Sequence, residues 1–394
     1  MKGYVGYLIA IALCFVFSAA QGQEQTLPLV EKQVFISEDF VTFGGETIPE
    51  VRVGWEAYGE LNEEKDNVIL ITHFFSGTSH AAGRYQESDP MPGYWDAIIG
   101  PGKAIDTNKY YVISSDTLVN QSPYDPNVVT TGPASINPET GKPYGLDFPV
   151  VTIRDFVNVQ KLLLDNLGID KLHAVVGASM GSLQALEWSI AYPDKVERML
   201  SVIGMGEIDP WTIATLQQWA NPIQLDPNWN GGDYYASEKP QEGVIQALMA
   251  ITLQAQHPLI FNQIHAQSSA RELAPLDDIH ANFSVVDSLR TMATQRATYA
   301  DANHILYLVR ANQLFLAGHG ENLESGLAQV EAKTLFLPAT NDLLLQPYLA
   351  QRVYNILNSQ NKPTAYEEIN GPWGHLDGII SIGTKAEEIR AFLQ

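Results

Sequence analysis

The stretch Val175-Val176-Gly177-Ala178-Ser179-Met180-Gly181-Ser182 decides the fold that this sequence predicts. Residues 172–176 form an apolar run that ends in two β-branched residues, which is typical of a short buried strand. A GxSxG turn follows, and residues 181–191 then carry apolar side chains at helical spacing. This order of strand, glycine-flanked serine and helix predicts that the Ser179 hydroxyl stands at the end of a sheet.

The same order is typical of the nucleophile elbow of α/β-hydrolases. Glycines two positions before and after the serine let the chain turn sharply, so that the hydroxyl stands clear at the carboxyl end of the sheet and at a helix N-terminus. A bare GxSxG occurs by chance in many sequences, and an ordinary turn is the alternative. Because a strand precedes the turn and a helix follows it, we predict that Ser179 is a catalytic nucleophile.

The composition sets the size of the fold and excludes two classes of partner. The chain has 394 residues, of which 45% are hydrophobic and 17% charged, which fits one large α/β domain with an insertion, or two domains. Lys and Arg number 23 against 45 Asp and Glu, so the formal net charge is -22. Such a surface repels nucleic acid and anionic lipid head groups, and we expect neither as a partner.

The N-terminal segment, residues 1–22, has the layout of a secretory signal peptide. A single early charge at Lys2 is followed by an apolar run over residues 4–17 and by small residues at positions 18–20. We expect cleavage at its end, a periplasmic or secreted protein, and no stable membrane insertion afterwards. An uncleaved N-terminal membrane anchor is the alternative, because the apolar run approaches spanning length.

The sequence predicts no cofactor. Cys14 is the only cysteine and lies within the segment expected to be removed, so the mature protein is expected to have no disulfide and no cysteine metal site. No HExxH, Walker loop or dinucleotide GxGxxG stands where its structural context demands. We therefore predict neither a metal nor a nucleotide cofactor.

Strands are predicted on both sides of the elbow. The first two should pair antiparallel around a Gly44-Gly45 turn, and the others have the buried character of strands in a parallel sheet. Together they predict a mostly parallel sheet of eight strands over residues 33–37, 51–58, 68–72, 110–115, 172–176, 199–203, 334–338 and 365–369.

A long segment after the sixth strand has helical periodicity and no strong strand pattern. We predict a helical lid insertion at residues 205–332, between two parts of the hydrolase core at 23–204 and 333–394. An independent helical domain is the alternative. The insertion is favoured because the strand pattern resumes afterwards as if interrupted. Its predicted helices cover residues 244–256, 285–299 and 306–317.

A serine nucleophile needs a base, and the base needs an acid that holds its tautomer. In α/β-hydrolases these follow in the order Ser, Asp or Glu, His, each on a loop after a strand. Ser179, Asp342 and His375 satisfy both the order and the placement, although each alone has a structural alternative as a turn, cap or packing residue. Three other histidines lack the required position and are interpreted as shaping loops or packing on the sheet: His73, His80 and His173.

Two backbone N–H groups are predicted to form the oxyanion hole. In this architecture one comes from the residue after the nucleophile, which is Met180. The other comes from a loop after an earlier strand, and the turn-forming residues 73–77 follow the buried strand at 68–72. We predict Phe75 as this second donor.

Several long motifs resemble the homoserine O-acetyltransferase family. They cover residues 100–106, 131–138, 145–149, 184–188 and 226–235, together with Arg154-Asp155. The resemblance implies an α/β-hydrolase that is a homodimer through its helical lid and that moves an acetyl group from acetyl-CoA to homoserine by a ping-pong route. It also implies that Ser179 is acylated, that His375 is base and then acid, that Asp342 orients His375, and that Phe75 and Met180 form the oxyanion hole.

The sequence departs from the family pattern where substrate would bind. Family members place an arginine pair for the homoserine carboxylate ahead of DPxWNGGDYY, and this chain has Ala220-Asn221 there. The aspartate expected after the histidine is Leu376, with Asp377 one place later. Residues 120–129 replace a glycine-rich loop, and the elbow is GASMGS rather than GGSMGG.

Acyl-enzyme chemistry is compatible with all of these departures. The sequence therefore predicts an exported serine acyl-transfer enzyme that acts on a small-molecule acyl ester or thioester. It is either an esterase with water as acceptor or an acyltransferase with an altered acceptor. A genuine homoserine O-acetyltransferase and a noncatalytic binding protein on the same fold are the alternatives.

Overall fold

The computed structural model describes residues 27–265, 276 and 278–394, so the signal peptide predicted at 1–22 lies outside the described residues. At its centre is an eight-stranded sheet in the order β1-β2-β6-β3-β7-β8-β9-β10. The pairs β1/β2 and β2/β6 are antiparallel, and all the other pairs are parallel. The mostly parallel eight-stranded sheet predicted from the sequence is confirmed. Its strands are β1 (Gln33–Val41), β2 (Thr47–Tyr58), β3 (Val68–Thr72), β6 (Tyr111–Ser115), β7 (Ala174–Ala178), β8 (Arg198–Val202), β9 (Lys333–Leu337) and β10 (Thr364–Tyr366).

Three predicted strand boundaries are wrong, namely the end of β1, the start of β2 and the end of β10. The hairpin β1/β2 is longer than predicted, because β1 runs on to Val41 through polar, exposed positions that an edge strand can leave in water. The last strand is shorter than 365–369, and beyond it only Ile369 bridges to Ala339. Pro338 lies opposite the gap and has no N–H to donate, which interrupts the ladder there.

Alternate residues of the central strands supply two separate hydrophobic cores. In β3, Val68 and Leu70 belong to one core, whereas Ile69 and Ile71 belong to the other. Successive side chains of a strand point to opposite faces, so both faces of the sheet must be covered. The first core is closed by apolar residues of α1 (Ile153–Asn166), α2 (Met180–Ala191) and α10 (Pro347–Ser359). The second is closed by α12 (Ala386–Leu393) and by the segment of the two short strands β4 (Ile99–Gly100) and β5 (Ile105–Asp106).

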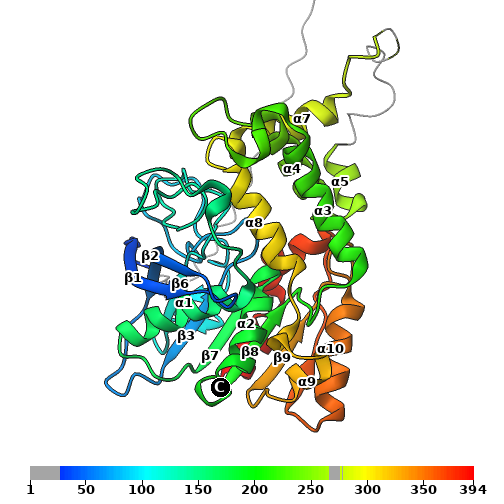
Figure 1. Ribbon diagram of the computed structural model, residues 1–394. Helices are drawn as coiled ribbons and strands as arrows, with labels where there is room; N and C mark the ends of the chain where they lie inside the picture. Colours follow the sequence, from blue (N-terminus) through cyan, green and yellow to red (C-terminus); the bar gives the residue numbers. More distant parts are fainter. Residues whose placement is uncertain (1–26, 266–275, 277) are drawn as a thin grey trace, which may run out of the picture.

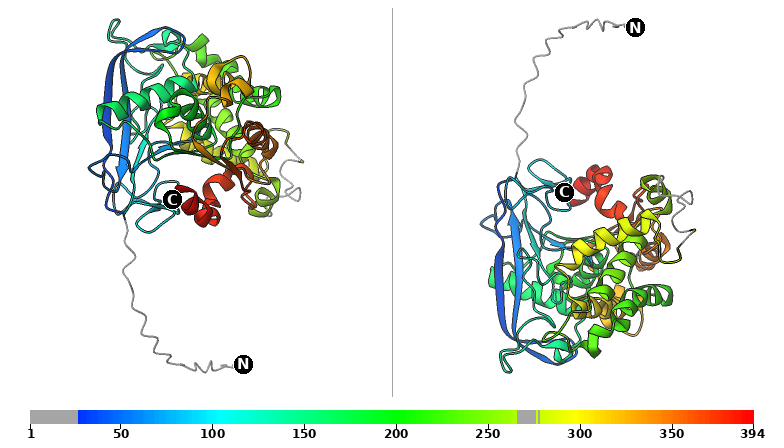
Figure 2. Two further views of the ribbon diagram at one scale, coloured as in Figure 1. Left: turned by 90° about the horizontal axis from the view of Figure 1, so that it is seen from below. Right: turned by 90° about the horizontal axis from the view of Figure 1, so that it is seen from above.

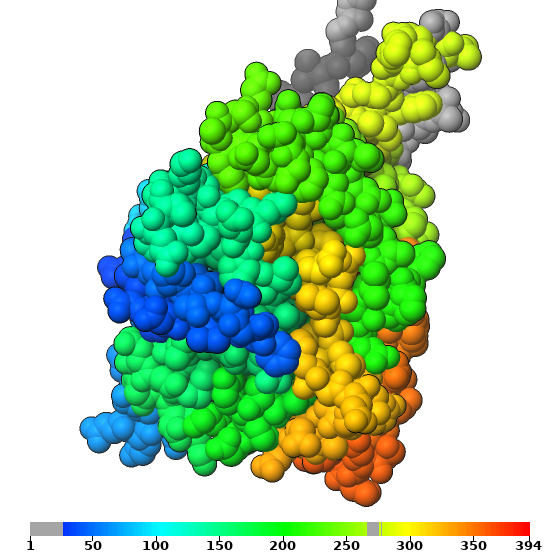
Figure 3. Space-filling view, viewed as in Figure 1, coloured from blue at the N-terminus to red at the C-terminus, as the bar shows by residue number. Residues whose placement is uncertain are grey.

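The chain between β8 and β9 is helical, and we call it the helical insertion. In Figure 1, its helices α3, α4 and α7 gather at one end of the molecule. In the space-filling view from the same side, the green surface of this segment stands above the orange surface of β9 to α10 (Figure 3). Two further views place the blue strands β1 and β2 along the opposite margin (Figure 2). The described α-helices of the insertion are α3 (Pro210–Leu225), α4 (Gln241–Gln254), α5 (Pro258–Ile264), α7 (Ser284–Ala297), α8 (Ala302–Gln313) and α9 (Leu323–Leu327).

Helix α3 was not predicted from the sequence, because Pro222 and several polar residues break its apolar pattern. Its N-terminus nevertheless carries an ordinary cap. The Asp209 side chain accepts a hydrogen bond from the Thr212 N–H at 2.8 Å, and Pro210 occupies the first helical position. The sequence signal for this helix is therefore the capping pattern and not the periodicity.

The DPNWNGGDYY motif, residues 226–235, ties the helices of the insertion together. Asp226 accepts hydrogen bonds from the N–H groups of Asn228 and Gly243, which joins the end of α3 to the start of α4. At its other end, the hydroxyls of Tyr234 and Tyr235 both donate to the carboxylate of Asp301, at 2.8 and 3.0 Å. Asp301 is the N-cap residue of α8. The motif therefore connects α3, α4 and α8 by hydrogen bonds.

Within the part of the chain that the structure describes, no single helix is long and apolar enough to cross a membrane. Only α4 and α5 taken together reach the required length and hydropathy, and they meet at a bend of 110°. The buried apolar side chains of α4 belong to the first hydrophobic core, which they share with one face of the sheet.

Candidate active site

Ser179 lies at the turn between β7 and α2, as the sequence predicts. Its backbone has φ 54° and ψ −122°, a strained conformation for a residue with a side chain. Gly177 and Gly181 are required because backbone atoms of neighbouring segments lie too close to leave room for a side chain. A Cβ at Gly177 would lie 2.1 Å from the carbonyl oxygen of Gly181, and one at Gly181 would lie 2.0 Å from the carbonyl oxygen of Thr72. The elbow is thus packed directly against β3.

The structure brings the three predicted side chains into one hydrogen-bonded chain. The Ser179 hydroxyl lies 2.8 Å from His375 Nε2, and His375 Nδ1 lies 2.7 Å from Asp342 Oδ2. All three residues are buried. Because an ionised carboxylate only accepts hydrogen bonds, the imidazole carries its proton on Nδ1 and leaves Nε2 free to accept from the serine.

Asp342 is held by the backbone of its own loop, which follows β9. Its Oδ1 accepts hydrogen bonds from the N–H groups of Leu344 and Leu345, at 2.8 and 2.9 Å. These bonds occupy the oxygen that does not face His375, so the carboxylate has little freedom to rotate. The aspartate is fixed before any substrate arrives.

His375 is held by an aspartate that the sequence did not mark as functional. Asp377 is fully buried, and its Oδ2 accepts hydrogen bonds from the N–H groups of Trp373 and Gly374, at 3.1 and 3.0 Å. Its Oδ1 accepts one from the Ser381 hydroxyl. Gly374 adopts φ +72°, and a Cβ there would lie 2.9 Å from a backbone nitrogen of the helical insertion. Asp377 therefore stabilises the tight turn that positions the His375 imidazole beside Ser179.

We call the loop of residues 371–376, which carries His375, the histidine loop. The helical insertion contacts it through the connection between α4 and α5. The N–H of His257 donates to the carbonyl oxygen of Trp373, and the N–H of Leu376 donates to the carbonyl oxygen of Ala255, both at 3.2 Å. The two backbone hydrogen bonds couple the position of the insertion to that of His375.

The two residues predicted for the oxyanion hole lie at the start of α2 and in the loop after β3. Met180 is the first residue of α2, where an N–H has no acceptor within the helix. Phe75 lies in the loop after β3, and among the described residues its N–H makes no hydrogen bond. The side-chain amide of Gln184, on α2, donates to the carbonyl oxygen of His73 at 3.2 Å and so holds this loop against the helix.

The three histidines interpreted as structural make hydrogen-bond contacts outside the Ser179–His375–Asp342 chain. His73 Nδ1 lies 2.8 Å from the carbonyl oxygen of Phe74, and burial lowers the pKa of the His73 imidazole. The His80 ring lies 3.1 Å from a carboxylate oxygen of Glu56, and the His173 ring lies 2.6 Å from the backbone carbonyl of the penultimate residue.

Ser179 opens into a mostly apolar cavity of about 390 Å³ between the sheet and the helical insertion. The loop after β3, the histidine loop, α3, α4 and α7 all contribute to its walls. Such a volume suits a small organic molecule. Its lining includes Phe75, Trp219, Ile251, Arg296, His375 and Leu376.

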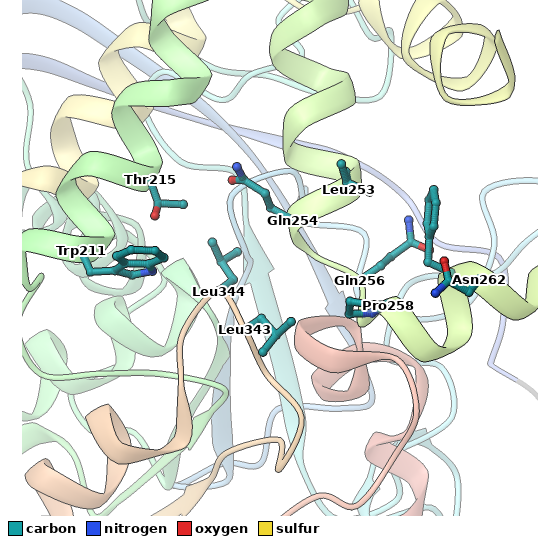
Figure 4. Close-up of a pocket in the computed structure, with 10 residues that line it drawn as sticks. Trp211, Thr215, Leu253, Gln254, Gln256, Pro258, Asn262, Leu343 and Leu344 are labelled. Atoms are coloured by element: carbon teal, nitrogen blue, oxygen red, sulfur yellow. The ribbon is translucent and has the colours of Figure 1, made fainter. Parts of the chain in front are cut away.

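A second hollow of about 390 Å³ adjoins the cavity, because Gln256 and Leu344 line both. Figure 4 shows its lining residues: Trp211 and Thr215 come from α3, and Leu343 comes from the loop after β9. Its position extends the cavity away from Ser179 between α3 and α5, which leaves room for a longer substituent of a substrate.

The described residues contain no group of three or more His, Cys, Asp or Glu side chains that could hold a metal ion.

Comparisons with known proteins identify the family of the chain. A model of the α/β hydrolase fold family matches residues 115–380. A homoserine O-acetyltransferase of Deferribacter desulfuricans is 38% identical over 375 residues, which are 94% of this chain and 97% of the relative. The chain belongs to the homoserine O-acetyltransferase family of α/β-hydrolases.

Solved structures of this family superpose closely on the chain. The homoserine O-acetyltransferase from Bacillus anthracis is 37% identical, with a TM-score of 0.90 over 93% of this chain and 98% of that one. The structure of esterase E22 is 59% identical, with a TM-score of 0.91 over 93% of this chain and 100% of that one. The chain is thus an enzyme of the α/β-hydrolase fold whose relatives include both acetyltransferases and an esterase.

Within this homoserine O-acetyltransferase family member, the cation near Ser179 comes from an unexpected element. Ala220 stands where the family motif has an arginine, and its side chain is buried at 3% exposure. Arg296, on α7, instead extends into the cavity. No motif surrounds Arg296 in the sequence, so only the packing of α7 over the cavity identifies it.

Proposed function

We propose that this protein is an exported serine acyl-transfer enzyme that acts on small acyl esters or thioesters, with Ser179, His375 and Asp342 as its catalytic triad. The observation that carries the proposal is the hydrogen-bonded chain from Asp342 through His375 to Ser179 at the wall of an apolar cavity. Serine is a weak nucleophile at neutral pH, and an adjacent imidazole held in the correct tautomer activates it.

In the first half of the reaction, Ser179 Oγ attacks the acyl carbon and His375 Nε2 takes the hydroxyl proton. The negative charge on the former carbonyl oxygen is stabilised by the N–H groups of Phe75 and Met180. Collapse of this intermediate breaks the bond to the leaving alcohol or thiol, which receives the proton from His375. The acyl group then remains on Ser179 as an ester.

In the second half, water or an acceptor hydroxyl gives its proton to His375 and attacks the acyl-enzyme. The bond to Ser179 Oγ breaks, the proton returns to the serine, and a carboxylic acid or a new ester leaves. Asp342 keeps the imidazole oriented and stabilises its positive charge in both halves.

Hydrolysis is favoured over transfer to homoserine by two observations. Ala220 replaces the arginine that the family resemblance implies, so the family's own position for binding the homoserine carboxylate carries no charge. In addition, esterase E22 is 59% identical to the chain, compared with 37% for the Bacillus anthracis acetyltransferase. Acetyl transfer from acetyl-CoA to homoserine is the second candidate, supported by the 38% identity to the acetyltransferase of Deferribacter desulfuricans.

A pair of assays tests the proposal. The mature protein and its Ser179→Ala variant are incubated with 4-nitrophenyl acetate, and separately with acetyl-CoA and homoserine while free thiol is measured. We expect ester cleavage that depends on Ser179 and no homoserine-dependent thiol release. Thiol release that requires homoserine would instead establish the acetyltransferase. Absence of serine-dependent turnover and of Ser179 acylation across a broad panel of acyl donors would indicate a binding protein on the same fold.

Export is supported by the charge, apolar run and small residues of positions 1–22. Cell fractionation followed by N-terminal sequencing tests it. We expect a periplasmic or secreted protein that has lost this segment. A membrane-bound protein that retains the segment would favour the anchor, and a cytosolic one would contradict export. The homodimer implied by the family resemblance stays a prediction, which sedimentation of the mature protein tests.

A further inference from the structure

We propose that Arg296 binds a carboxylate of the substrate, so that the enzyme prefers small esters that carry a negative charge. The proposal rests on the proposed function only in that the bound molecule is an ester. Arg296 lies on α7 and lines the same cavity as Ser179 and His375. It is the one Lys or Arg side chain among the described residues that line this cavity.

The guanidinium of Arg296 has hydrogen-bond partners but no counter-ion. One Nη donates to the Thr252 hydroxyl at 2.8 Å, and the other donates to the Ser76 hydroxyl at 3.2 Å. Both partners are neutral, and no carboxylate among the described residues lies within 4 Å. Since a guanidinium has five N–H groups, these two bonds leave N–H groups available to a ligand.

The energetics of burial favour an anionic ligand at this place. Burial lowers the pKa of the Arg296 guanidinium, but an arginine side chain remains protonated in proteins near neutral pH. Arg296 is only half-buried, so its charge is partly withdrawn from water. Partial loss of hydration without a counter-ion still has a cost, and a carboxylate that forms two parallel N–H···O bonds offsets it. Arginine suits a planar carboxylate better than lysine does.

The position of Arg296 places the carboxylate close to the reacting ester. Ser76, one of its partners, directly follows Phe75, the proposed oxyanion donor. The opposite partner, Thr252, lies on α4 near the connection that contacts the histidine loop. The remaining walls are mainly apolar, and the volume is about 390 Å³. A small molecule whose ester and carboxylate are a few bonds apart fits the cavity and can reach Ser179 and Arg296 at the same time.

Arg290 provides a matched control on the same helix. It is exposed and forms a salt bridge with Glu242 at the surface of the insertion, so its charge is already paired. A purely structural role for Arg296 is the competing explanation, because its two hydrogen bonds also tie α7 to α4 and to the loop after β3. Such a tether would affect all substrates alike.

Two pairs of near-isosteric esters separate these explanations. Mono-4-nitrophenyl succinate and 4-nitrophenyl 4-methylpentanoate differ by a carboxylate on the acyl side, and acetoxyacetate and isobutyl acetate differ by one on the alcohol side. We expect wild type to prefer the charged member of at least one pair. Arg296→Gln should lower kcat/KM for that member by about 10- to 100-fold, the usual loss of a charged hydrogen bond, and leave the neutral member nearly unchanged. Arg296→Lys should restore part of the loss, and Arg290→Gln should have no effect.

An equal loss for charged and neutral esters in Arg296→Gln would overturn the proposal in favour of the tether. Lack of a wild-type preference for either charged ester would also overturn it. Calorimetric titration with succinate, which contains no ester, supplies a readout independent of catalysis. Succinate binding that Arg296→Gln abolishes would support the carboxylate site even if Ser179 acylation, and with it the proposed function, failed. No succinate binding in an inactive wild-type protein would reject both.

Discussion

At the scale of single residues, the site depends on side chains whose orientation is fixed from more than one direction. Asp342 faces His375 with one oxygen and two backbone N–H groups with the other. Asp377 acts one step further away, since it holds the turn that carries His375 and not the imidazole itself. The two aspartates therefore differ in what their removal should do.

Asp342→Asn should lower kcat for 4-nitrophenyl acetate by roughly 10⁴-fold, the loss known for the equivalent change in serine proteases, because an amide favours the wrong imidazole tautomer. The melting temperature should change little, since the amide oxygen can still accept from the backbone N–H groups. Stopped assays and thermal unfolding measure both quantities. Retention of more than about a tenth of wild-type kcat would contradict the role of Asp342.

Asp377→Asn is the matched comparison. The amide has one acceptor oxygen in place of two, so a bond to Ser381 or to the turn N–H groups is lost. We expect a lower melting temperature, with a free energy of unfolding reduced by about 1 to 3 kcal/mol, and a much smaller loss of kcat than in Asp342→Asn. A loss of kcat equal to that of Asp342→Asn with unchanged stability would assign Asp377 to the chemistry instead.

The sequence predicted the three residues of the hydrogen-bonded chain because their order along the chain and their places after strands are set by the fold. It could not identify Asp377 as a clamp or Arg296 as a cavity residue. The partners of Asp377 are backbone groups of a turn, and those of Arg296 lie 44 and 220 positions away. Contacts of these kinds leave no periodic pattern or motif.

At the scale of elements, the helical insertion is joined to the core through Asp301. This buried carboxylate accepts hydrogen bonds from the hydroxyls of Tyr124, Tyr234 and Tyr235, and from the N–H of His304 at the start of α8. Tyr124 belongs to the core, whereas the other partners belong to the insertion. One side chain thus links both parts of the molecule.

Asp301→Ala should leave four donors without their acceptor and loosen the insertion. We expect the free energy of unfolding to fall by about 2 to 4 kcal/mol, and amide hydrogen exchange to rise in α3, α4 and α8 more than in β3 and β7. Asp278→Ala, at an exposed position of the same segment, is the control and should change neither. Uniformly faster exchange across the sheet would contradict a local link.

Among the elements, those with strong periodicity were predicted best. The central strands lie within two residues of their predicted positions, because burial on both faces imposes the apolar pattern. The helix α3 and the two-residue strands β4 and β5 were missed, since a helix whose apolar pattern is interrupted by Pro222 and polar residues, and a pair of such short strands, show no clear period. Long-range packing determines them.

At the scale of the whole molecule, acidic residues dominate the charge, and one of them is buried at the centre of a polar cluster. Glu56 is fully buried, and its carboxylate lies 2.8 Å from Lys32 Nζ and 3.1 Å from His80 Nδ1. It also accepts hydrogen bonds from the hydroxyls of Tyr58 and Tyr85. Burial alone raises the pKa of Glu56, but the contacts with His80, Lys32 and Tyr85 outweigh it and hold the pKa at about 2.

Because the folded-state pKa lies below the usual value of 4.5, the ionised Glu56 stabilises the fold at neutral pH. This contribution is present above pH 4.5 and is lost as the pH falls toward about 2. Glu56→Gln should therefore be less stable than wild type at neutral pH, and the difference should shrink across that window. Urea unfolding at several pH values measures it, with the exposed Glu63→Gln as control. A difference that stays constant with pH would contradict the assignment.

The central claim is that Ser179 carries the acyl group during turnover. Rapid mixing with 4-nitrophenyl acetate, acid quenching and mass spectrometry of the proteolytic peptides test it most directly. We predict an acetyl group on the peptide at Ser179, formed at a rate consistent with turnover and absent from the Ser179→Ala variant. Steady turnover that survives in Ser179→Ala, or an acetyl group found only on another residue, would contradict the account.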